Sequence, residues 1–101
     1  VLTGANFPLL TKVQKVIQSF GKSDVTVEGH TDSNGLKATN DQLSVDRAEA
    51  VKAYFVANAQ DEPLSIRAVG YGFQKPLATN RTQNGRAQNR RVDVLIQVAS
   101  N

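Results

Sequence analysis

The sequence has no cysteine, no internal repeat, no low-complexity tract and no block of like charges. The absence of cysteine excludes disulfides and cysteine-based metal sites, but it fits either a reducing compartment or a periplasmic domain without bridges. No apolar run approaches the roughly 18 residues of a membrane span, and the first residues do not show the basic-plus-apolar pattern of a signal. The abrupt start at Val1 leads us to expect an excised fragment whose anchoring segment would lie upstream.

The 101 residues fit one domain, expected to span 1–101, and 40% hydrophobic content is enough for one compact core. The net charge is +3 and the sequence pI is about 9.5. This mild excess permits an anionic partner without requiring one.

Apolar periodicity and turn signals predict an alternation of strands and helices. The helices are expected at 7–20 and from about 39 to 58, the second with a capping box from Thr39 to Gln42. Strands are expected at 25–28, 64–69 and 91–98, after the end of a short first strand at 1–3, with a long polar loop over 73–89. Strands joined through helices imply parallel neighbours with helices covering the sheet.

The second helix carries an anomaly. On a helical wheel its core-facing sector also contains Asn40 and Arg47, and it is otherwise apolar, with Leu43, Val51, Tyr54 and Phe55 at its centre and Ala48 and Ala50 at its edges. Arginine is almost never fully buried unless it is paired. Asp32 is the candidate partner, because it follows a strand directly and ligands bind outside the carboxyl ends of such strands.

A carboxylate and a guanidinium held a few ångströms apart complement the ammonium and carboxylate of a free amino-acid end. Two alternatives need no ligand. Asp32 and Arg47 could form a purely structural ion pair, or the apolar stripe could be rotated so that Arg47 reaches water. Asp32 lies directly after a strand, among short polar residues, and this position favours a ligand-binding site over the two alternatives.

Three segments resemble the OmpA-like domain family, which includes Pal-type lipoproteins and MotB-type flagellar proteins. They are Val27-Glu28-Gly29-His30-Thr31-Asp32 with Ser33-Asn34-Gly35, the helix pattern N-x-x-L-S-x-x-R-A-x-x-V from Asn40 to Val51, and Gly70-Tyr71-Gly72 with Pro76, Asn80 and Gly85-Arg86-Ala87-Gln88-Asn89-Arg90-Arg91-Val92. The resemblance spans nearly the whole chain. It implies an α+β, two-layer βαβαββ fold in which helices pack on a mixed sheet.

The resemblance also implies non-covalent binding of peptidoglycan in the periplasm of a Gram-negative bacterium, with the parent protein attached to the outer membrane or cell envelope. Arg47 would hold the carboxylate of meso-diaminopimelate and Asp32 its ammonium. Thr31, Asn40, Leu43 and Ala48 would line the pocket, Arg90 would approach from the last loop and Asn6 from the loop after the first strand. Family members often carry an acidic residue where this chain has Gly4-Ala5, and the first strand is truncated.

Neither catalysis, a cofactor nor a metal is expected. His30 is the only histidine, most metal sites need three or four ligands, and no nucleophile-elbow motif occurs. We expect His30 to be held by structural hydrogen bonds.

Arginines gather around the last loop, at Arg81, Arg86, Arg90 and Arg91. A nucleic-acid binder is one alternative function, but stacking aromatics are sparse near that loop. We expect Arg86 and Arg91 to be tied to backbone carbonyls. A protein-interaction domain that uses the same fold without a ligand is the other alternative, and a direct Asp32–Arg47 bond would favour it.

Overall fold

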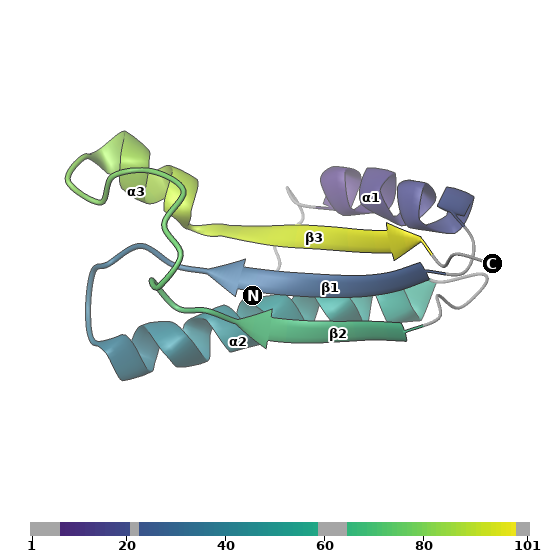
Figure 1. Cartoon of the computed structure of the whole chain (residues 1–101), viewed down its shortest axis with the longest axis horizontal. Helices are drawn as coiled ribbons and strands as arrows, with labels where there is room; N and C mark the ends of the chain where they lie inside the picture. The colour runs from purple at the N-terminus through teal and green to yellow at the C-terminus, as the bar shows by residue number, and fades with distance from the viewer. Residues whose placement is uncertain (1–6, 21–22, 59–64, 99–101) are drawn as a thin grey trace.

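The computed structural model describes residues 7–20, 23–58 and 65–98. Their elements follow the order α1 (Phe7–Phe20), β1 (Ser23–His30), α2 (Lys37–Asn58), β2 (Ser65–Gly70), α3 (Gln83–Asn89) and β3 (Arg91–Val98). Figure 1 shows α1 and α2 on one side of the sheet and α3 beyond its end. No helix in these ranges is long and apolar enough to cross a membrane.

The three described strands form a mixed sheet in the order β2-β1-β3. β1 and β2 are parallel and are joined by the α2 crossover, whereas β1 and β3 are antiparallel, with His30 opposite Arg91. The carboxyl ends of β1 and β2 and the start of β3 therefore meet at one edge. This arrangement confirms the expected α+β class and mixed sheet; the expected strand at 1–3 lies outside the described residues.

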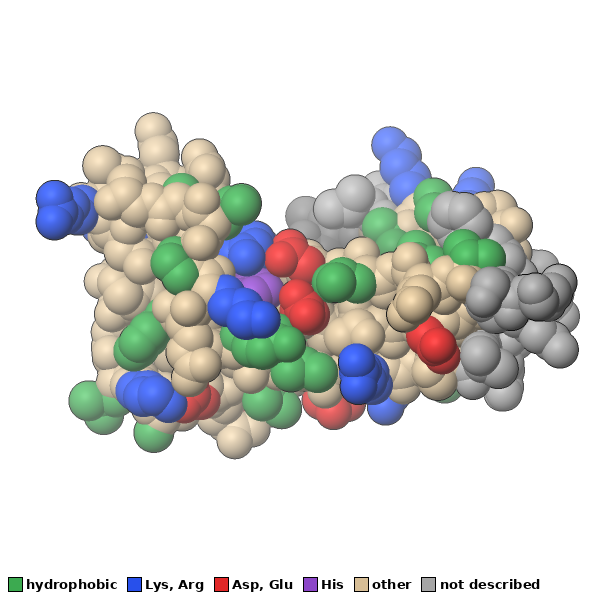
Figure 2. Space-filling view, in the orientation of Figure 1, with side chains coloured by type: hydrophobic (Ala, Val, Ile, Leu, Met, Phe, Trp, Pro, Cys, Tyr) green, Lys and Arg blue, Asp and Glu red, His purple; other side chains and the backbone are tan. Residues whose placement is uncertain are grey.

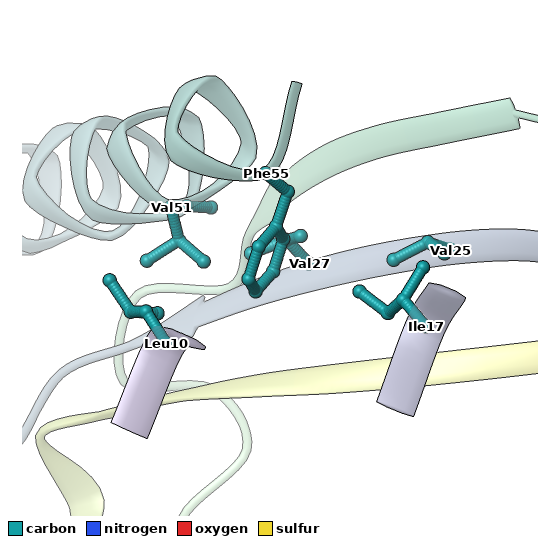
Figure 3. Close-up of a cluster of buried hydrophobic side chains, with 7 residues drawn as sticks. Leu10, Ile17, Val25, Val27, Val51 and Phe55 are labelled. Carbon is teal, nitrogen blue, oxygen red and sulfur yellow. The ribbon is translucent and has the colours of Figure 1, made fainter. Parts of the chain in front are cut away.

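The core lies between the sheet and the two long helices (Figure 3). It contains Leu10 and Ile17 from α1, Val25 and Val27 from β1, and Ala48, Val51 and Phe55 from α2. Alternate β1 residues point to opposite faces, so Asp24, Thr26 and Glu28 lie on the other face of the sheet and are exposed or half-buried. We call this the open face.

Helix α2 is rotated relative to the predicted stripe. Its buried residues are Asn40, Ser44, Ala48, Val51 and Phe55, whereas Leu43, Arg47 and Tyr54 are only half-buried. The cause is close backbone contact: a Cβ at Gly29 would collide with the carbonyl of Ser44, and one at Gly70 would lie 2.6 Å from its hydroxyl. Small residues therefore decide which face of α2 meets the sheet, and the prediction that Arg47 sits within the core stripe was wrong.

The bounds of α1 and β3 agree with the sequence prediction. Helix α2 begins at Lys37, two residues earlier than expected, so Thr39 lies inside the first turn rather than at the cap. The predicted polar loop contains α3, whose start is capped by the Thr82 hydroxyl accepting from the Gly85 N–H at 3.0 Å.

Candidate functional site

The segment after β1 is anchored at the carboxyl ends of the two parallel strands. The Thr31 N–H donates to the Gly72 carbonyl at 2.8 Å, and the Tyr71 N–H donates to the Gly29 carbonyl at 3.0 Å. The Thr31 hydroxyl also donates to the carbonyl of Asp32 at 2.9 Å. These bonds place Thr31 and Asp32 at the edge where ligands bind in α/β sheets.

Asp32 is a buried carboxylate, with 7% of its surface exposed. Its Oδ1 accepts from the Asn34 N–H at 3.0 Å, and its Oδ2 accepts from Arg90 Nη1 at 2.6 Å. Burial alone would raise the pKa of Asp32, but the Asn34 N–H and the Arg90 guanidinium outweigh burial and hold this pKa below its usual value. Asp32 is thus a charged acceptor at neutral pH.

Asn40 ties the first turn of α2 to the same loop. Its side chain is buried, and its amide nitrogen donates to the Asn34 carbonyl at 2.7 Å. Asn34 in turn donates to Asp32, so Asn40 holds the loop that shapes the carboxylate. Thr31, Asp32 and Asn40 are therefore brought together, as the sequence predicted.

Arg47 makes no hydrogen bond or ion pair with any described residue, and it is half-buried. It follows Asn40 by seven residues, so it lies almost directly above Asn40 two turns further along α2. Asp32 pairs with Arg90 instead, because the antiparallel register of β1 and β3 brings residue 90 beside residues 31 and 32. The direct Asp32–Arg47 pair of the structural alternative is not formed.

Leu43 and Ala48, the remaining expected pocket residues on α2, differ in exposure. Leu43 is half-buried on the same flank as Arg47, whereas Ala48 is fully buried in the core. Asn6 lies outside the described residues. The contact of each with a ligand stays a prediction.

A network around Asn89 positions Arg90, and sequence reasoning gave Asn89 no role. Asn89 is fully buried; its Oδ1 accepts from the N–H groups of Leu77 and Ala78 at 2.7 and 2.9 Å. Its amide nitrogen donates to the Ala78 carbonyl and to Asn80 Oδ1 at 2.9 and 2.8 Å. Asn80 and Asn89 both belong to the third segment that resembles the family, and this was the one sign in the sequence that Asn89 has a role.

Two other arginines behave as the sequence predicted. Arg86 Nη1 donates to the Asn80 carbonyl at 3.0 Å, and Arg91 Nη2 donates to the Lys75 carbonyl at 3.2 Å. Each guanidinium therefore donates to one backbone carbonyl, and Arg91 Nε also pairs with Asp93.

His30 differs from its prediction. Its ring is 2% exposed and stacks on Tyr71 with centroids 5.6 Å apart, yet neither ring nitrogen forms a hydrogen bond within the part of the chain that the structure describes. Burial first, and then the charge of Arg91, lower the pKa of His30, although Asp93 and Glu28 oppose this. The imidazole is therefore neutral at pH 7, and the expectation that hydrogen bonds hold it was wrong.

Two hollows on the described surface lie away from Asp32. One, of about 670 Å³, covers the open face, and another, of about 700 Å³, lies between α1 and β3; neither is lined by Asp32 or Arg47. The candidate site consists of the charged and polar side chains around Asp32, outside both hollows.

Several known proteins are similar to this chain. The model of the OmpA family matches residues 2–90. The chain is 45% identical over 96 residues to Photosystem I P700 chlorophyll a apoprotein A2 of Gloeobacter violaceus, covering 89% of this chain and 11% of that protein. It is 43% identical over 81 residues to outer membrane porin F of Pseudomonas aeruginosa, covering 80% of this chain and 23% of that protein.

A third relative is the peptidoglycan-binding protein ArfA of Mycobacterium tuberculosis, 37% identical over 97 residues, which are 94% of this chain and 29% of that protein. The chain thus spans a small part of the length of these relatives.

Among solved structures, the peptidoglycan-associated lipoprotein of Burkholderia pseudomallei superposes with a TM-score of 0.83 at 28% identity, covering 95% of this chain and 80% of that chain. The fold agrees with the family match, which covers most of the sequence. The chain therefore belongs to the OmpA family.

Proposed function

We propose that this domain binds peptidoglycan non-covalently, by gripping the free amino-acid end of meso-diaminopimelate. The observation that carries the proposal is Asp32, a desolvated and ionised carboxylate at the carboxyl ends of two parallel strands. Its negative charge is paired with the guanidinium of Arg90, which lies directly before β3. The Arg90 side chain is 44% exposed, so it has room to move. A ligand ammonium would replace that guanidinium at Asp32 Oδ2.

Arg47 would supply the second charge. Helical side chains lean toward the N-terminus of their helix, so Arg47 leans toward Asn40 and the loop of Asp32. Its guanidinium is not committed to any described acceptor, and its planar fork suits a carboxylate. Asp32 and Arg47 would then hold the ammonium and carboxylate of one amino-acid centre, with Arg90 turning from Asp32 toward the ligand.

The relatives support the wall as the partner. ArfA is named as a peptidoglycan-binding protein and the Burkholderia lipoprotein as peptidoglycan-associated, and neither name is that of an enzyme. Porin F is named as an outer membrane protein. We place this domain in the periplasm of a Gram-negative bacterium, anchoring a membrane-attached parent to the wall without catalysing a reaction.

The arginines around the last loop give the nucleic-acid alternative little support. Arg86 and Arg91 each donate to a backbone carbonyl, and Arg90 pairs with Asp32. Of the four arginines around the last loop, this leaves the exposed Arg81, and one guanidinium does not make a surface that tracks several phosphates. The protein-interaction alternative would have been favoured by a closed Asp32–Arg47 bond, which is not formed. Neither is proposed.

Calorimetry with two muropeptides tests the proposal. A meso-diaminopimelate stem peptide carries both charges at its free end, whereas a lysine-type peptide carries only the ammonium. We expect the wild-type domain to prefer the former, Arg47→Ala to remove that preference, and Asp32→Ala to abolish binding of both. The exposed residues Glu49 and Arg81 give charge-matched controls: Glu49→Ala and Arg81→Ala should bind as the wild type does. Equal, negligible heats for both peptides with the wild-type domain would reject the proposal.

A further inference from the structure

Three potential ligand side chains converge on the open face, where β1 meets β3. Glu28 and Asp93 are direct partners in the antiparallel register, and His30 lies two residues after Glu28, hence on the same face. One oxygen or nitrogen atom from each residue lies within 4.8 Å of the other two. Figure 2 shows histidine, acidic and basic side chains gathered on this face.

His30 presents an unsatisfied nitrogen to this cluster. The ring is almost completely buried, and its Nε2 lies 3.4 Å from Asp93 Oδ2 and 3.8 Å from Glu28 Oε1 without forming a hydrogen bond to either. Buried polar groups normally have a partner, so the unpaired Nε2 beside two carboxylates needs an explanation. A cation held between Nε2 and the two carboxylates would provide that partner.

We propose that Glu28, His30 and Asp93 form a binding site for a divalent transition-metal ion of the Zn²⁺ type. One imidazole nitrogen with two carboxylate oxygens suits zinc, whereas calcium and magnesium take oxygen ligands alone. Zinc–ligand distances of about 2.0–2.2 Å place tetrahedral ligands about 3.4 Å apart. The separations from Nε2, 3.4 and 3.8 Å, are close to this spacing, and water would fill the fourth position.

Neighbouring side chains would orient the ligands. Tyr71 stacks on His30 at an interplanar angle of 19°, which fixes the plane of the ring. Arg91 Nε lies 3.2 Å from both oxygens of Asp93, so it can keep Oδ1 while Oδ2 turns to the metal. Partners of this kind tune metal ligands in known sites. Asp32 takes no part in the cluster, so the metal site goes beyond the proposed wall binding.

Titration of the untagged, chelator-treated chain with ZnSO₄ tests the inference. We expect one zinc ion per chain, a rise in melting temperature, and a change in the ring nitrogen NMR signals of His30, which are unambiguous because it is the only histidine. Cobalt(II) should give the absorption bands of a tetrahedral site. Magnesium and calcium should produce none of these effects.

Variants separate this site from weak surface binding. His30→Gln and Glu28→Gln should each weaken zinc binding by more than about tenfold, and Glu28 is partly exposed, so its variant tests the site even if the buried His30 variant does not fold. Asp24→Asn is the control, since Asp24 is an exposed carboxylate on the same face, bound to Ser65. The proposal is overturned if zinc does not bind, or if Glu28→Gln binds it as tightly as Asp24→Asn does.

Discussion

Replacing Asp32 with asparagine should separate ligand binding from fold stability. The change keeps the size of the side chain and one acceptor oxygen for the Asn34 N–H, but it removes the negative charge. A hydrogen bond to a charged group contributes about 1.5–3 kcal/mol. At about 1.4 kcal/mol per factor of ten, we expect Asp32→Asn to weaken binding of a meso-diaminopimelate muropeptide about 10- to 150-fold.

The stability of the same variant should change far less. The lost partner, Arg90, is 44% exposed, so its guanidinium can turn to water. Ion pairs with an exposed partner contribute about 0–1 kcal/mol, and asparagine also removes the cost of burying the charge of Asp32. The free energy of unfolding should therefore fall by less than about 1 kcal/mol. Calorimetry with the muropeptide and urea unfolding followed by circular dichroism measure the two quantities. Binding within about threefold of wild type in a folded variant would refute the role of Asp32.

Further predictions concern the neighbours of Asp32. Arg90→Ala leaves a buried carboxylate with one fewer partner, so unfolding free energy should fall by about 1 kcal/mol and the melting temperature by about 4–8 °C; an unchanged melting curve would contradict the pairing. Arg47→Ala should abolish sacculus pull-down while leaving stability unchanged or slightly higher, since no described bond is lost; retention on sacculi would remove Arg47 from the site. Asn89→Ala strands the N–H groups of Leu77 and Ala78, and urea unfolding should show a loss of about 3 kcal/mol; a loss below about 1 kcal/mol would contradict this network. Because the pKa of Asp32 is lowered in the folded state, its contribution to stability is present above the usual carboxyl pKa of about 4 and is lost as pH falls through the lower folded value. The difference in unfolding free energy between wild type and Asp32→Asn, measured in chelator, should therefore stay constant from about pH 7 to 5 and shrink only below about pH 4; a difference that disappears near neutral pH would contradict the assignment.

Local sequence patterns were sufficient to predict the elements whose structure depends on residues close together in the sequence. The apolar spacing of α1 and the alternation in β3 gave the bounds of both elements. Helix α3 could not be predicted in this way, because its seven residues are mostly polar and include Gly85. It is held by contacts made elsewhere, such as the Asn89 bonds to residues 77–80.

The rotation of α2 and the pairing of Asp32 depend on parts of the chain that are distant in sequence. Gly29 and Gly70 admit the backbone of α2 at Ser44, and a wheel that weights large apolar residues cannot detect this. The partners Asp32 and Arg90 are 58 residues apart. Likewise, Glu28 and Asp93 meet only through the strand register, so the sequence pattern did not indicate metal-binding neighbours for His30.

A crystal structure of the domain with meso-diaminopimelate bound is the most direct test of the proposed recognition. We predict that the ligand ammonium lies within hydrogen-bonding distance of Asp32, that the adjoining carboxylate meets the guanidinium of Arg47, and that Arg90 has left Asp32 Oδ2. A ligand bound elsewhere, with the Asp32–Arg90 pair intact, would contradict it.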